Sequence, residues 1–133
     1  RQYVKDRIEH VLMLTQPPFG IRKNELCNIT SLDLWFKELN DTHMRTFSTA
    51  LASGALAKLT RLYLSNNQIG DVGLTAFAAN GSLSLETLGL EENSIGDAGL
   101  SALASACAKG ALLALKELNL AKNQIGDGWM SGR

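Results

Sequence analysis

The chain has 133 residues, and its thirteen basic and thirteen acidic side chains balance to a formal net charge of zero. This balance disfavours non-specific nucleic-acid binding, and no apolar run approaches the ~18 residues that a membrane span requires. Two cysteines are too few for a disulfide framework. We therefore expect a cytoplasmic protein with neither a nucleic-acid nor a membrane partner.

The first 28 residues differ from the rest, and we treat 1–28 as an N-terminal flanking helix and loop. Apolar residues recur at helical spacing over 2–14, and Pro17 and Pro18 end any such helix. Residues 19–28 are expected to form a loop into the first strand. The helix either covers the edge of that strand or belongs to a truncated preceding repeat.

From residue 29 to residue 133 one pattern recurs. The frame L-x-x-L-x-L-x-x-N-x-I-G-D is present at 59–71, 85–97 and 115–127, and a weaker copy with Lys37 at the asparagine position begins at residue 29. Units thus start at 29, 59, 85 and 115, and the last is incomplete. The second unit is shorter by four residues, about one helical turn. We interpret the sequence as an excerpt of a longer protein.

The frame predicts one strand and one helix in each complete unit. Alternating leucines predict strands at about 31–35, 61–65, 87–91 and 117–121. Apolar residues at helical spacing predict helices near 42–53, 71–80 and 97–109. Strands that are joined through helices run parallel. Cys107 falls on the apolar face of the last helix, so we expect it to be buried.

The repeated polar residues are best explained as scaffold. A buried asparagine amide can both donate to and accept from the backbone of two turns, which predicts a structural ladder of Asn67, Asn93 and Asn123. The glycine of each Gly-Asp pair is expected to adopt a conformation closed to other residues. The aspartate is expected to cap its own helix. These pairs are Gly70-Asp71, Gly96-Asp97 and Gly126-Asp127. Close approach to the next unit is the expected reason for Gly73 and Gly99 in the first helical turn.

The frame resembles the leucine-rich repeat of the ribonuclease-inhibitor type, and its N-x-I-G-D-x-G-L wording resembles repeats of NOD-like receptors. The resemblance covers about 29–130. It implies an α/β right-handed solenoid, a horseshoe arc with a parallel sheet on the concave face and helices on the convex face. It also implies a protein-interaction module within a larger receptor or scaffold.

Two other functions stay open. The first is an enzyme regulator, either a GTPase-activating or a nuclease-inhibiting repeat protein. The balanced charge argues against the former, and the two cysteines argue against the latter. The second is no autonomous function, if the chain is one segment of a long array. Self-association through uncapped ends is also expected, since an open strand edge invites pairing.

We found no constellation that would make the chain an enzyme. His10 and His43 have no cysteine or carboxylate cluster at metal-ligand spacing. No phosphate-binding loop follows a strand, and Ser65 and Ser94 have no base placed to activate them. We therefore expect no catalysis, no metal and no cofactor.

The candidate binding residues lie where the repeats differ. At strand positions that should face away from the helices, residue identity changes from unit to unit, as a partner-specific face requires. Aromatic and arginine residues are the usual interface anchors, so Trp35, Arg61 and Tyr63 are the candidates, with Glu91 and Glu92 as an acidic margin. The alternative is that Trp35 and Phe36 pack against residues 1–28.

Overall fold

The computed structural model describes residues 9, 12–79 and 84–126. Its strands are β1 (Ser31–Asp33), β2 (Arg61–Tyr63), β3 (Thr87–Gly89) and β4 (Glu117–Asn119). The helices that alternate with them are α2 (Asp41–Ala52), α3 (Asp71–Ala79) and α4 (Asp97–Ala108). Two short 3-10 turns, η1 (Met13–Thr15) and η2 (Lys23–Glu25), precede the first strand. The predicted helix over 2–14 lies mostly outside the described residues.

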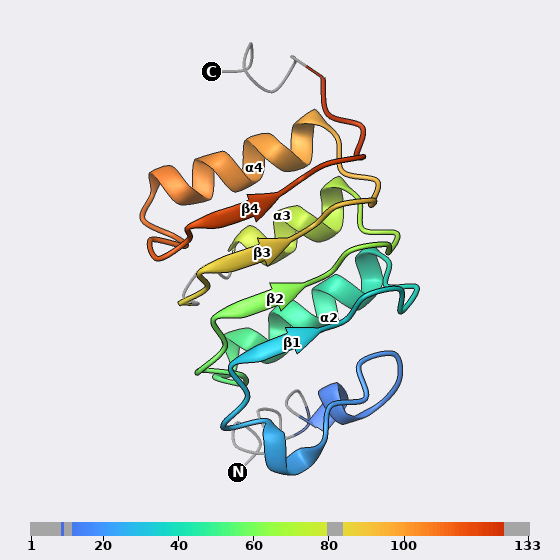
Figure 1. Cartoon of the computed structure of the whole chain (residues 1–133), viewed down its shortest axis with the longest axis vertical. Coiled ribbons are helices and arrows are strands. Elements are labelled where there is room, and N and C mark those ends of the chain that lie inside the picture. Colours follow the sequence, from blue (N-terminus) through green and yellow to red (C-terminus); the bar gives the residue numbers. More distant parts are fainter. Residues whose placement is uncertain (1–8, 10–11, 80–83, 127–133) are drawn as a thin grey trace.

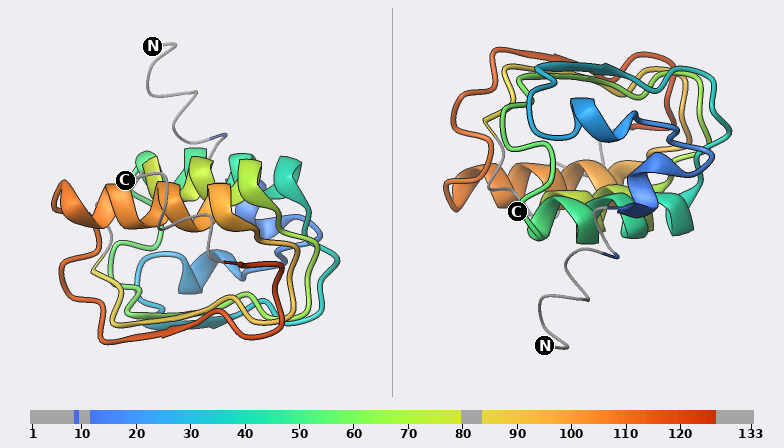
Figure 2. Two further views of the ribbon diagram at one scale, coloured as in Figure 1. Left: turned by 90° about the horizontal axis from the view of Figure 1, so that it is seen from above. Right: turned by 90° about the horizontal axis from the view of Figure 1, so that it is seen from below.

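The four strands form one parallel sheet in chain order, β1-β2-β3-β4. The units stack in register, because Leu32, Leu62, Leu88 and Leu118 are successive partners along the sheet. Figure 1 shows the strands in front of the helices, and Figure 2 shows two layers when the stack is viewed along its length. The predicted architecture of one strand and one helix per unit is therefore confirmed.

The strands begin where the sequence predicts but end two residues earlier. Beyond each strand the chain turns, and the residue before the frame asparagine position has a positive φ close to 55°. This conformation costs an ordinary residue roughly 1–2 kcal/mol, and asparagine tolerates it best. The residues concerned are Phe36, Asn66, Glu92 and Lys122. The helices agree with the prediction to within one residue.

The core lies between the sheet and the helices. The second unit illustrates it, since Leu62, Leu64, Ile69 and Leu74 are all fully buried. At the N-terminal end, residues of the flanking segment close the core, and Phe19 stacks on Phe47 of α2 with ring centroids 5.6 Å apart. The other buried residues of this segment are Leu14, Ile21 and Leu26. The described part of the segment therefore covers the first unit.

The last described unit is more exposed to solvent than the first. All three residues of β4 are exposed, including Leu118 at 40%. Cys107 is also exposed, so the expectation that it is buried is wrong. The equivalent residue of α2, Leu51, is covered by neighbours on both sides, whereas no described unit packs on the far side of α4. Among the described residues, no helix is both long and apolar enough to cross a bilayer.

Candidate functional site

The frame asparagines join neighbouring units through the backbone. Asn93 Nδ2 donates to the carbonyls of Leu64 (2.9 Å), Leu90 (3.0 Å) and Glu91 (3.2 Å). Its Oδ1 accepts from the Ile69 amide at 3.1 Å. One buried side chain therefore satisfies groups in its own turn and in the preceding turn, and it has little capacity left for a ligand.

The first unit has no frame asparagine of its own, yet its turn is satisfied. Asn67 Oδ1 accepts from the amides of Lys37 and Leu39, each at 3.0 Å, and Asn67 Nδ2 donates to the Leu34 carbonyl at 3.0 Å. Each asparagine serves the unit before it as well as its own, so with a lysine at position 37 the first turn still receives these three bonds from Asn67.

The aspartates cap the next unit's helix. Asp71 Oδ1 accepts from the amides of Gly96 (2.8 Å) and Gly99 (2.9 Å), at the start of α4. The expectation that each aspartate caps its own helix is wrong, because the N-cap position of α4 is Gly96. Similar single bonds join Asp41 to Gly70 and Asp97 to Gly126. The predicted role of Asp127 lies outside the described residues.

The glycines of these turns are needed for space. Gly96 has an extended backbone, with φ −109° and ψ −164°, and Gly70 and Gly126 are not left-handed either, so the expected conformation is wrong. A Cβ at Gly99 would instead lie 2.7 Å from Asp71 Oδ1 and 3.2 Å from Asp71 Cα. Close approach is confirmed as the reason for Gly73 and Gly99, but the unit that they approach is the preceding one and not the next one, as was expected.

The first helix is capped locally. Asn40 Oδ1 accepts from the His43 amide at 3.1 Å, and His43 Nδ1 accepts from the Asn40 amide at 3.0 Å. This reciprocal capping box replaces the aspartate that a preceding unit would supply. No group of three or more His, Cys, Asp or Glu side chains in the described part of the chain is suited to hold a metal ion.

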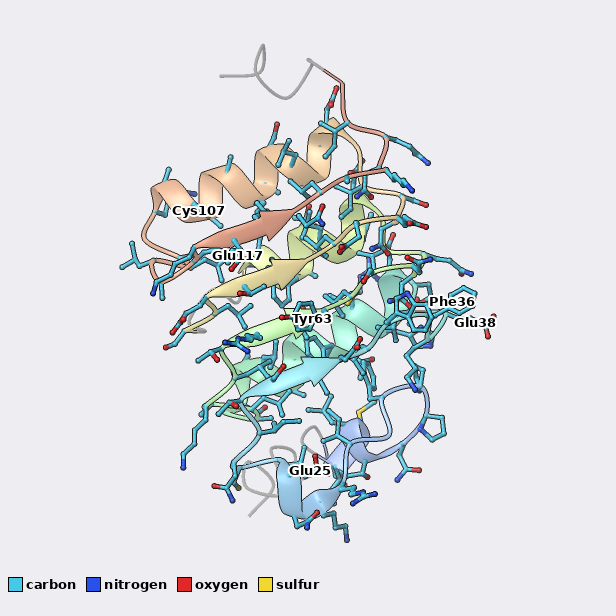
Figure 3. The ribbon with its side chains drawn as sticks, in the orientation of Figure 1. Glu25, Phe36, Glu38, Tyr63, Cys107 and Glu117 are labelled. Carbon is cyan, nitrogen blue, oxygen red and sulfur yellow. The ribbon has the colours of Figure 1, made fainter. Side chains whose placement is uncertain are left out.

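Two aromatic rings stand in solvent in the turn that follows β1, at the edge of the sheet surface that faces away from the helices, which is here called the open face; Figure 3 shows Phe36 beyond the strands, beside Glu38. Trp35 is 55% exposed and Phe36 is 67% exposed, and their ring centroids are 5.5 Å apart. Both lie just beyond the end of β1, where the Trp35 amide donates to Asp33 Oδ1 at 2.9 Å. This exposure does not fit the alternative in which the two rings pack against residues 1–28.

Further along the open face lies a hollow of about 510 Å³, here called the Gly89 hollow. Tyr63 on β2 and Glu117 on β4 line it, and Figure 3 shows both over the strands. The side chain of Glu91 folds back toward Gly89, so that Glu91 Oε1 lies 3.0 Å from where a Gly89 Cβ would be. The other residues of the lining are Thr87, Leu88, Lys116, Leu118 and Asn119.

The five candidate residues do not all come together. Tyr63 and Glu91 meet over Gly89, and Arg61 is exposed on the same strand as Tyr63. Trp35 instead contacts Phe36. Glu92 turns toward the next unit, where its Oε1 lies 3.7 Å from Lys122 Nζ. The sequence reading missed Gly89, although a glycine within a strand is a recognised sign of close approach.

A second hollow, of about 570 Å³, lies between α3 and α4 on the helical side. Its walls are mostly alanine, among them Ala78, Ala102 and Ala106, and Lys109 is its one charged residue. It therefore offers no polar arrangement from which a ligand can be argued.

Comparison with protein families matches the leucine-rich-repeat model to residues 55–78, 81–104 and 114–128. No curated protein matches the chain. The first unit lies outside the matched stretches, but β1 pairs with β2 as the later strands pair with one another. The three matched stretches are leucine-rich repeats, and the chain folds as an α/β leucine-rich-repeat solenoid.

Proposed function

We propose that the chain is an interaction module that binds a protein partner through the open face of its sheet. Leucine-rich repeats are in general protein-interaction modules, and stacked repeats build extended binding surfaces. The scaffold asparagines and aspartates are already engaged with neighbouring units. A partner must therefore bind residues that the stack does not use.

The aromatic pair Trp35–Phe36 is the observation that carries this proposal. Single exposed apolar side chains are common on any protein surface, but two contacting aromatic rings, both more than half exposed, are a larger apolar feature. Tryptophan is among the residues that most often dominate binding energy. Phe36 also holds a positive φ of 55° while leaving its ring in solvent. Within its unit, the ring contact given for Phe36 is the one with Trp35.

The helical side of the solenoid exposes less apolar side-chain surface than the turn that follows β1. Val72 on α3 is its one large apolar helix residue in the described chain that is strongly exposed, at 49%. Val72 therefore provides a matched control, since it is about as exposed as Trp35 but lies on the opposite side of the sheet.

The test is a comparison of partner binding between Trp35→Ala and Val72→Ala. A partner is first isolated with the unaltered chain, and its affinity for each variant is then measured by calorimetry. Losing an aromatic anchor costs about 2 kcal/mol, or roughly thirtyfold in affinity. We expect that loss for Trp35→Ala and no change for Val72→Ala. Far-UV circular dichroism should be the same for all three proteins.

The reverse result, weaker binding with Val72→Ala and unchanged binding with Trp35→Ala, would place the interface on the helices and contradict the proposal. A second variant guards against misfolding at position 35. If Trp35→Ala lowers the thermal midpoint, Trp35→Phe keeps an aromatic ring and should restore both the fold and most of the affinity.

A further inference from the structure

Gly89 is the one glycine in the four described strands, and the fold itself gives no reason for it. Its φ is not positive. A Cβ there would meet first the ends of two side chains, Glu91 Oε1 at 3.0 Å and Tyr63 Cδ1 at 3.3 Å, while the nearest backbone atom is 3.8 Å away. Glycine weakens a strand, so another residue would suit the sheet better. What glycine provides is room for the Glu91 carboxylate and the Tyr63 ring, which cover it and line the hollow.

The carboxylate of Glu91 lies in this hollow with part of its bonding capacity unused. Asn119 Nδ2 donates to Glu91 Oε2 at 2.8 Å, and Asn119 is itself fixed because its Oδ1 accepts from the Ala121 amide at 3.0 Å. Glu91 Oε1 is buried and has no hydrogen-bond partner. An unsatisfied carboxylate oxygen is costly. Because Glu91 as a whole is only partly buried, a rotation of its side chain away from Gly89 would bring this oxygen to a donor that arrives from outside.

The surroundings of the hollow favour a cation as that donor. Glu91 and Glu117 line it, and no described ion pair engages either one. Lys116 is the one basic residue of the lining, and its Nζ lies 3.9 Å from Glu86 Oε1. The hollow is therefore negative, and the Tyr63 ring beside the carboxylate offers an aromatic surface to a positive group.

We infer that the Gly89 hollow binds an arginine side chain of the protein partner. A guanidinium is planar, so it can stack on Tyr63 while it donates to Glu91, and the rim carboxylate of Glu117 adds attraction. Lysine can offer only a point charge there. The inference rests on the proposed function, because it assigns the chemistry of one contact within the open face.

The test uses N-acetyl-arginine methylamide as the probe and follows backbone amide signals of the full chain by NMR. We expect saturable shifts at Gly89 and Asn119, with a dissociation constant on the order of millimolar for so small a probe. The citrulline analogue has the same shape without the charge, and it should cause no saturable shift. Equal shifts with both probes, or none with arginine, would overturn the inference.

Two variants separate binding from folding. Glu91→Gln keeps an acceptor for Asn119 but removes the charge, and should weaken arginine binding about tenfold or more. Gly89→Val fills the hollow with a residue that favours strands, so binding should be lost while the thermal midpoint holds or rises. Glu92→Gln, whose carboxylate faces Lys122 outside the hollow, is the control and should bind normally. Arginine binding that survives both Glu91→Gln and Gly89→Val contradicts the assignment.

The arginine probe tests the assignment of the Gly89 hollow, whereas partner binding tests the proposed function. If the probe fails while Trp35→Ala still weakens the partner, only the arginine assignment is wrong. If the partner binds through the helices, the proposed function is wrong whatever the probe shows.

Discussion

The turns that follow the strands and the open face of the sheet use their polar residues in opposite ways. In the turns, the aspartate equivalent to Asp71 recurs in every unit and the asparagine equivalent to Asn93 in all but the first, and the neighbouring backbone occupies Asn93 and Asp71. On the open face, Arg61 and Trp35 do not recur, and both stand in solvent. The repeated polar residues therefore hold the stack together, and those that vary are free to meet a partner.

The first unit shows where the stacking rule stops. Its helix is capped by Asn40 and His43 of the same unit, while α4 is capped by Asp71 of the unit before it. Its turn lacks an asparagine and takes that of the second unit. A unit thus receives asparagine bonds from the unit after it in addition to those of its own asparagine where it has one, and α4 receives its cap from the unit before it. Changes to these residues should lower stability and leave the open face intact.

The largest expected loss comes from Asn93→Ala. It removes four hydrogen bonds and leaves the Ile69 amide and the Leu64 carbonyl without their side-chain partner in a buried turn. We expect a loss of about 1–3 kcal/mol, measured by urea unfolding. Asn66 is the matched control, but its φ of 55° makes alanine strained there, so the control is Asn66→Gly. Equal urea midpoints for the two variants would contradict the asparagine ladder.

Gly99→Ala is expected to cause a somewhat smaller loss of stability. Alanine favours a helix over glycine by about 1 kcal/mol, but its Cβ would lie 2.7 Å from Asp71 Oδ1. Overpacking costs roughly 1–3 kcal/mol, so we expect the midpoint to fall. His43→Ala is the comparison at the equivalent place in the first unit. It removes the bond from the Asn40 amide to His43 Nδ1 and the edge contact with Phe19, and we expect it to lower stability by about 1 kcal/mol or less. A higher midpoint for Gly99→Ala would show that the units are not so closely spaced.

The smallest expected effect is a gain in stability, and we expect it for Phe36→Asn. It gives the first unit the residue that the second unit has at the same turn, and asparagine tolerates the φ of 55° better than phenylalanine. Because the Phe36 ring is 67% exposed, little packing is lost. We expect a gain of up to about 1 kcal/mol in thermal or urea unfolding, together with weaker partner binding. Lys37→Gly, which lies next in the chain without a positive φ, should give no gain.

The sequence was a good guide to the fold because alternation and helical spacing are local. Leu62 and Leu64 predicted β2, and Leu74 with Phe77 predicted the buried face of α3. The sequence was a poorer guide to the hydrogen bonds between neighbouring units. In a repeat, Asp71 is followed both by its own helix and, one period later, by the next helix, and spacing alone does not say which one it caps. Only the structure shows Asp71 bonded to Gly96 and Gly99.

The exposure of Cys107 and part of the candidate site could not be predicted, because the sequence pattern carries no information about contacts between units. Cys107 has the spacing of a buried residue, but burial also needs a unit on the far side of α4. The open face was predicted from residues that vary, which gave Tyr63 and Trp35 but not Gly89. The backward fold of Glu91 depends on Asn119, which is 28 residues away along the chain, so no local pattern could reveal it.

The most direct test of the account is cross-saturation NMR on the complex of the chain with its partner. The method irradiates the partner and records which amide signals of the chain lose intensity. Binding through the open face predicts loss at Trp35, Tyr63 and Gly89, and none at Val72 or along the exposed surfaces of α3 and α4. Intensity loss confined to those helical surfaces, with the strand signals unchanged, would contradict the claim that the open face is the binding surface.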